Sequence, residues 1–101
     1  MGAYVALLTI HLHFPESGSL KEKRAELNSV KARLRQKLGA SVAEVDHQDT
    51  WQRSTLAAAL VAGTYTLVEH EADAVERYMV DRFPDGCRIE RTLASFEEVW
   101  G

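Results

Sequence analysis

The stretch that decides the fold is residues 19–39, "SLKEKRAELNSVKARLRQKLG", where apolar residues change from alternate spacing to helical spacing. Ser19, with Glu22 three residues later, has the pattern of a capping box, and Gly39 stands where a glycine commonly ends a helix. The segment is therefore predicted to be an amphipathic helix. Its apolar stripe consists of Leu20, Leu27, Val30, Leu34 and Leu38.

Before this helix, residues 3–14 alternate in the way that is typical of a strand, and Pro15 and Gly18 end it. The alternation divides the strand into two faces. The continuously apolar face, predicted to lie against the core, contains Tyr4, Ala6, Leu8, Ile10, Leu12 and Phe14. The other face contains Val5, Leu7, Thr9, His11 and His13.

After the helix, residues 40–46 and 54–63 predict a second and a third strand. The third is rich in alanine, but its place after a turn-like "DHQD" favours a strand. Residues 64–84 return to helical spacing, with Thr64 or Thr66 as the cap and Pro84 at the end. A fourth strand is predicted within residues 87–100, where Phe96, Val99 and Trp100 close the chain. The second helix has its apolar stripe at Val68, Ala72, Val75, Met79 and Phe83.

The predicted order is β-α-β-β-α-β, in a single domain over residues 1–101. Right-handed crossovers fold that order into an α+β, ferredoxin-like sandwich: a four-stranded antiparallel sheet with both helices on one face and the first and third strands central. The other face is open, and its apolar part predicts homodimerisation through the sheet. We expect this face to display Val5, Leu7, Thr9, His11, His13, Val42, Glu44, Asp46, Ala57, Ala59 and Val61.

The bulk composition sets limits on the class of protein. With 101 residues, 46% apolar and 27% charged, the default is one compact soluble domain. Cys87 is the single cysteine, so an internal disulfide cannot form, which favours a reducing compartment, the cytosol. The apolar N-terminus lacks a basic region and is interrupted by Thr9, His11 and His13, so a strand is predicted there rather than a signal peptide or membrane span.

The net charge of −3 hides a local basic segment. Residues 21–37 hold seven of the twelve basic residues against two acidic ones, Glu22 and Glu26, a net +5. A pI of 5.8 argues against a simple nucleic-acid binder, whereas the local segment argues for a basic face. The alternative is an ordinary solvated helix face, because alternate spacing spreads these residues around the helix axis. They are Lys21, Lys23, Arg24, Lys31, Arg33, Arg35 and Lys37.

Residues 42–55, "VAEVDHQDTWQRST", concentrate polar and aromatic side chains between two predicted strands. In a structural interpretation, Asp46 and Asp49 stabilise a turn, Trp51 covers the core at the sheet edge, and Arg53 pairs with Glu44 across the hairpin. Two functional interpretations stay open. One is an acid/base or metal cluster of Glu44, Asp46, His47 and Asp49; the other is an RNA-contacting edge of His47, Trp51, Gln52 and Arg53.

No catalytic apparatus and no cofactor are predicted. His11 and His13 share a face, but zinc needs further ligands, and Glu44 or Asp46 lies two strands away, roughly 10 Å. The two histidines are therefore interpreted as surface residues. Cys87 has no base beside it in the sequence, and no phosphate-binding glycine loop or C-x-x-C is present. No nucleophile-elbow context surrounds Ser41, Ser54 or Ser95.

Two stretches, "SLKEKR" at 19–24 and "AEVDHQDTWQR" at 43–53, resemble the YlxP-like family of small uncharacterised bacterial proteins. The resemblance covers essentially the whole chain and implies the ferredoxin-like fold. It also implies a link to translation, because genes of this family often sit among those for initiation and ribosome assembly. It implies no activity, cofactor or catalytic residue. The family motif comprises Glu44, Asp46, His47, Gln48, Asp49, Trp51 and Gln52.

The sequence as a whole favours a non-enzymatic RNA- or ribosome-associated domain that holds phosphate through its first helix. The alternatives are a small-molecule or metal-dependent activity at the "EVDHQD" connection and a structural dimerisation module. For the favoured function, we expect the nucleic-acid contacts to come from Lys21, Lys23, Arg24, Lys31, Arg33, Arg35, His47, Trp51 and Arg53.

Overall fold

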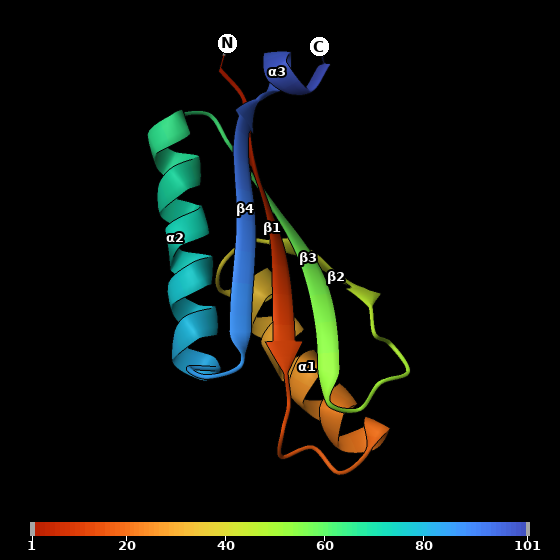
Figure 1. Ribbon diagram of the computed structural model, residues 1–101. Coiled ribbons are helices and arrows are strands. Elements are labelled where there is room, and N and C mark those ends of the chain that lie inside the picture. The colour runs from red at the N-terminus through yellow and green to blue at the C-terminus, as the bar shows by residue number, and fades with distance from the viewer. Residues whose placement is uncertain (1, 101) are drawn as a thin grey trace.

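The computed structural model describes residues 2–100 and has an α+β architecture, with a four-stranded antiparallel sheet and three helices (Figure 1). The sheet order is β2-β3-β1-β4, so the first and third strands are central, as predicted. In chain order the elements are β1 (Tyr4–His13), α1 (Leu20–Gln36), β2 (Ser41–Asp46), β3 (Arg53–Ala62), α2 (Tyr65–Arg82), β4 (Cys87–Ser95) and α3 (Phe96–Trp100).

A single hydrophobic core fills the space between one face of the sheet and the two long helices (Figure 1). On β1, Ala6, Leu8, Ile10 and Leu12 are buried at alternate positions, because a strand turns every second side chain to the same face. The helices meet them with the predicted stripes. These are Leu27, Val30 and Leu34 of α1 and Val68, Ala72, Val75 and Met79 of α2. Within residues 2–100, no helix combines the length and apolar character needed to cross a membrane.

The helix ends follow the signals in the sequence. Ser19 Oγ accepts a hydrogen bond from the backbone N–H of Glu22 at 3.1 Å, and the Glu22 carboxylate accepts one from the N–H of Gly18 at 2.7 Å. Thr64, rather than Thr66, caps α2 by accepting from the N–H of Leu67 at 3.1 Å. After α1, Gly39 has a φ of 72°, a conformation that suits glycine.

Two predictions for the sheet and chain end need correction. Val42 is buried and Glu44 points to the helix-covered side, so neither belongs to the open face. A β-bulge between Glu44 and Asp46 then changes the register, and Asp46 lies opposite Thr55 on the open face, as predicted. The segment after Ser95 forms the short helix α3, whereas the sequence predicted no helix there.

Candidate functional site

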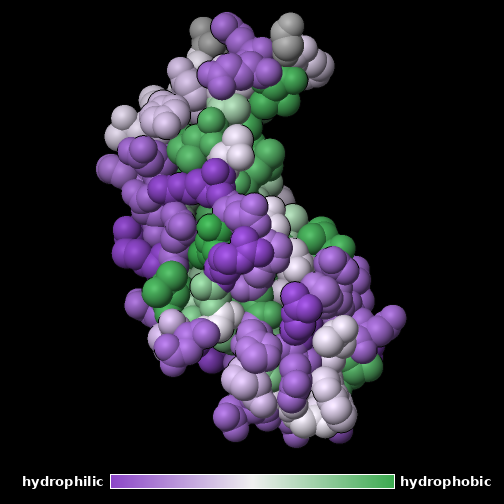
Figure 2. All heavy atoms as spheres, in the orientation of Figure 1, coloured by the Kyte–Doolittle hydropathy of each residue, from purple (hydrophilic) through white to green (hydrophobic). Residues whose placement is uncertain are grey.

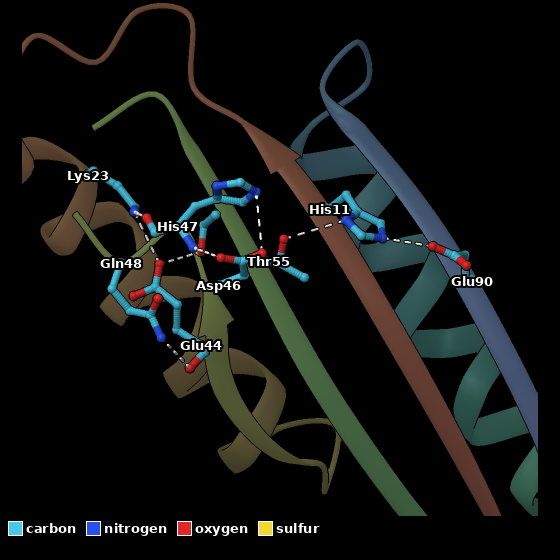
Figure 3. A network of polar contacts seen from close by, with 9 residues as sticks. His11, Lys23, Glu44, Asp46, His47, Gln48, Thr55 and Glu90 are labelled. Carbon is cyan, nitrogen blue, oxygen red and sulfur yellow. Dashed lines mark hydrogen bonds and ion pairs between the residues drawn. The ribbon is translucent and has the colours of Figure 1, made fainter. Parts of the chain in front are cut away.

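Lys23 is fully buried, although lysine is one of the residues least often found in protein interiors. Its ammonium group donates hydrogen bonds to the carbonyl oxygens of His47, at 2.5 Å, and Thr50, at 2.6 Å. The Glu44 carboxylate lies 3.1 Å from Nζ (Figure 3). Lys23 therefore ties α1 to the connection between β2 and β3, and links the two stretches "SLKEKR" and "AEVDHQDTWQR" in space.

This arrangement contradicts two sequence-based assignments. Lys23 was expected to contact phosphate, but a side chain with no exposed surface cannot do so. Arg53 was expected to pair with Glu44, but the Glu44 carboxylate instead accepts a hydrogen bond from Ser54 Oγ at 2.5 Å and pairs with Lys23. Arg53 is exposed, and its side chain makes no polar contact with residues 2–100.

The connection at residues 47–52 is a compact turn. His47 has a φ of 63°, a left-handed conformation that is uncommon for residues with a side chain. Its N–H donates to Asp46 Oδ1 at 2.8 Å, and its carbonyl accepts from the N–H of Thr50 at 3.2 Å. Asp46 thus has the predicted role of a carboxylate that satisfies turn backbone. Glu44 and Asp46 point to opposite sides of the sheet, so they do not form one acid/base pair.

Trp51 lies at the surface of this connection and is 50% exposed. It takes no part in the core, so the expectation that it covers the core at the sheet edge is wrong. The neighbouring Gln52 is bound to the first loop, since its carbonyl accepts from the N–H of Phe14 at 2.8 Å. Trp51 therefore presents an aromatic surface to solvent on a connection that is fixed at both ends.

Four cations of α1, of which Lys31 is half-buried and the other three are exposed, are less scattered than the sequence suggested. Lys21, Arg24, Lys31 and Arg35 follow one another at spacings of three, seven and four residues, which places them on one side of the helix. We call these four residues the basic stripe. The Arg35 guanidinium donates to the carbonyl of Val42 at 2.7 Å, so the stripe runs beside β2.

The other side of α1 faces α2. Arg33 lies over the ring of Tyr78 at 5.7 Å, and Glu26 lies 3.7 Å from Arg82. Glu26 therefore pairs with Arg82 of α2 and does not neutralise the basic stripe. Among residues 2–100, no member of the basic stripe takes part in an ion pair.

A separate polar group occupies the open face of the sheet (Figure 3). His11 Nε2 lies 2.8 Å from Glu90 Oε1, and Arg88 donates to the same oxygen at 3.1 Å. These hydrogen bonds hold the pKa of Glu90 below its usual value, and the one from His11 has the larger effect. Within the described chain, no group of three or more histidine, cysteine, aspartate or glutamate side chains is arranged to hold a metal.

Cys87 begins β4 and is partly buried. Burial raises the pKa of its thiol, and the negative charge of Glu76 raises it further. Both effects keep the side chain in the thiol form at neutral pH, which is the unreactive form. The arrangement therefore opposes a role as a nucleophile.

Comparison with known proteins agrees with the resemblance seen in the two motifs. The chain is 39% identical to the uncharacterized protein YlxP of Bacillus subtilis (strain 168) over 82 residues. The aligned region covers 81% of this chain and 85% of the relative. Its fold is similar to that of a de novo designed protein, Foldit4, with a TM-score of 0.59 and 9% identity over 91% of this chain and 96% of the designed one. Residues 5–92 match the family described as "Protein of unknown function (DUF503)", and the chain belongs to that family.

Proposed function

We propose that this protein is a non-enzymatic, RNA- or ribosome-associated domain that holds phosphate groups along the basic stripe of α1. The observation that carries the proposal is the stripe itself: Lys21, Arg24, Lys31 and Arg35 share one side of a helix with no opposing carboxylate. Such a local concentration of positive charge is the usual electrostatic signature of a phosphate-binding surface, whatever the net charge of the chain.

The connection at residues 47–52 supports the proposal by its position. Lys23 binds the carbonyls of His47 and Thr50, which holds the connection against the first turns of α1, where Lys21 and Arg24 lie. Trp51 is half exposed there and offers a ring on which an unpaired base can stack. Lys23 itself acts as a positioning residue in this proposal, because it cannot reach a ligand.

Two of the predicted nucleic-acid contacts, Arg33 and Arg53, lie away from the basic stripe. Arg33 lies on the side of α1 that faces α2, and Arg53 begins β3 opposite His13, on the open face of the sheet. Neither residue belongs to the proposed phosphate-binding surface. The remaining contacts come from the basic stripe, His47 and Trp51.

We interpret the fold as ferredoxin-like, on the basis of the strand order and the two helices that pack on one face. We place the protein in the cytosol, in keeping with its single free cysteine. The family resemblance suggests a role near translation, which makes ribosomal subunits the first partner to test.

The test is RNA binding across a salt series, with a matched pair of variants. Arg24→Glu with Lys31→Glu reverses two charges on the stripe. Arg33→Glu with Lys37→Glu reverses two exposed charges away from it, one on α1 and one at the C-cap of the helix. The stripe variant is expected to weaken binding and to lower the salt slope by about 1.4, since each single-strand phosphate contact contributes about 0.7. Equal loss of affinity in both variants would show a general charge effect and refute the stripe.

A second proposal concerns self-association through the open face. Leu7 of β1 and Val61 of β3 lie on this face and are 49% and 61% exposed, and Ala57 and Ala59 add small side chains on β3. Figure 2 shows hydrophobic residues gathered in the upper half of the view, below the end that carries α3, where the outline is hollowed. A second copy of the chain is the occupant that we propose, because an exposed apolar sheet face suits sheet-to-sheet packing.

A further inference from the structure

A hollow on the open side of the sheet lies apart from the basic stripe. It has a volume of about 310 Å³ and is found where β1 ends and where β3 and β4 begin. Four nitrogen-bearing side chains line it: His11, His13, Arg53 and Arg88. Asp85 is the one carboxylate on its wall, beside Leu12, Gly86 and Cys87. We infer that this hollow is a binding site for a phosphate group.

Strand pairing brings the four nitrogen-bearing side chains together. His13 lies directly opposite Arg53 on β3, and His11 lies directly opposite Arg88 on β4. Opposed residues in a sheet project from the same face and stand about 5 Å apart. An anion in the hollow can therefore be approached by donors from three strands, with no rearrangement of the backbone.

Two of these side chains are free to receive a ligand. The Arg53 guanidinium and the His13 ring make no hydrogen bond or ion pair with any other residue in the described part of the chain. Arg53 lacks an acidic partner because of contacts on the other face of the sheet. Lys23 and Ser54 hold the Glu44 carboxylate there, so the acid that would neutralise Arg53 is turned away from it.

The other two side chains are held in place. Glu90 accepts hydrogen bonds from both His11 and Arg88, which fixes one wall of the hollow while leaving further N–H groups of the Arg88 guanidinium available. Gly86, which also lines the hollow, packs closely against the backbone of His13. A Cβ atom on Gly86 would lie 2.7 Å from the carbonyl oxygen of His13, and the Gly86 carbonyl accepts from the N–H of His13 at 2.9 Å.

The chemistry of the wall selects an anion with several acceptor oxygens. Guanidinium groups are the side chains best suited to phosphate, since they offer paired donors and a permanent positive charge. The carboxylate of Asp85 opposes the ligand, and its removal is expected to strengthen binding. That sign separates a phosphate site from a cation site, for which loss of Asp85 would weaken binding.

The test is titration of the isotopically labelled protein followed by NMR, with inorganic phosphate, adenosine 5′-monophosphate and a single-stranded RNA without terminal phosphates as separate probes. Saturable shifts of the backbone amides of His13, Gly86 and Arg88 are expected. Arg53→Gln, a change at an exposed residue without contacts, is expected to weaken binding about three- to tenfold. Asp85→Asn is expected to strengthen binding about twofold or more, as for removal of one exposed like charge.

The three probes identify the source of the phosphate. Binding of inorganic phosphate and the mononucleotide alone would indicate a small phosphorylated molecule, whereas binding of the RNA would indicate a backbone phosphodiester. Arg24→Glu with Lys31→Glu, which alters only the basic stripe, is expected to leave the shifts in the hollow unchanged. Absence of shifts with all three probes, or equal affinity of Arg53→Gln and the native chain, would overturn the inference while leaving the proposal for α1 standing.

Discussion

Replacing Lys23 by methionine is expected to destabilise the protein strongly. Methionine keeps most of the apolar stem but removes the ammonium group, which leaves the carbonyls of His47 and Thr50 without their donor. It also leaves the Glu44 carboxylate, only 17% exposed, with Ser54 as its remaining partner. Removing one partner of a buried ion pair costs about 3–5 kcal/mol, against a total stability of about 5–15 kcal/mol for a typical domain.

The measurement is urea unfolding followed by circular dichroism, with Lys21→Met as the matched control. Lys21 is exposed on the same helix turn and has no ion pair among the described residues, so its loss is expected to change stability by less than about 0.5 kcal/mol. Lys23→Met combined with Glu44→Gln should recover part of the loss, since the uncompensated charge is removed. A cost below about 1 kcal/mol for Lys23→Met would refute the argument that this lysine holds the connection in place.

Three further predictions concern single side chains. Trp51→Ala is expected to change the free energy of unfolding, measured in urea, by less than about 1 kcal/mol. The same change is expected to weaken RNA binding, measured by fluorescence anisotropy, by about 1–3 kcal/mol. An unfolded variant would show that the ring is structural. Alkylation of Cys87 by iodoacetamide should have its midpoint at a higher pH than that of a free thiol, because burial and then the charge of Glu76 raise the pKa of Cys87. Glu76→Gln should move this midpoint to lower pH, and a midpoint that Glu76→Gln leaves in place would contradict the second cause. Leu7→Asp is expected to leave the protein monomeric in analytical ultracentrifugation at concentrations where the native chain is dimeric, and a native chain that stays monomeric at high concentration would rule out the open-face dimer.

The sequence predicted those features that depend on a long, regular pattern. The alternation along β1 correctly assigned Ala6, Leu8 and Ile10 to the core, and Ser19 and Gly39 marked the ends of the first helical segment. The sheet face predicted for Val42 and Glu44 was wrong, because β2 has only six residues and contains a bulge, so its pattern is short and irregular.

The candidate site was less accessible to prediction, since its central contact joins residues far apart in the chain. Lys23 was grouped with the solvent-facing cations because lysine is seldom buried. One signal was present in its spacing: Lys23 stands four residues before Leu27 and seven before Val30, on the same side of the helix as the buried stripe. The ion pair with Glu44 depends on tertiary packing that no local pattern describes. Arg53 lies on the open face because it stands opposite His13 in the register of β3.

The bulge in β2 has a consequence for aggregation. β2 is an outer strand of the sheet, and such strands offer unpaired backbone groups onto which another chain can build a cross-β stack. Here the regular ladder of β2 is short and is interrupted between Glu44 and Asp46, while Arg35 occupies the carbonyl of Val42. The strand is therefore a poor template for fibril growth. Any sheet extension between molecules is expected to begin instead at β4, the other outer strand, whose nine residues pair with β1 without a register shift.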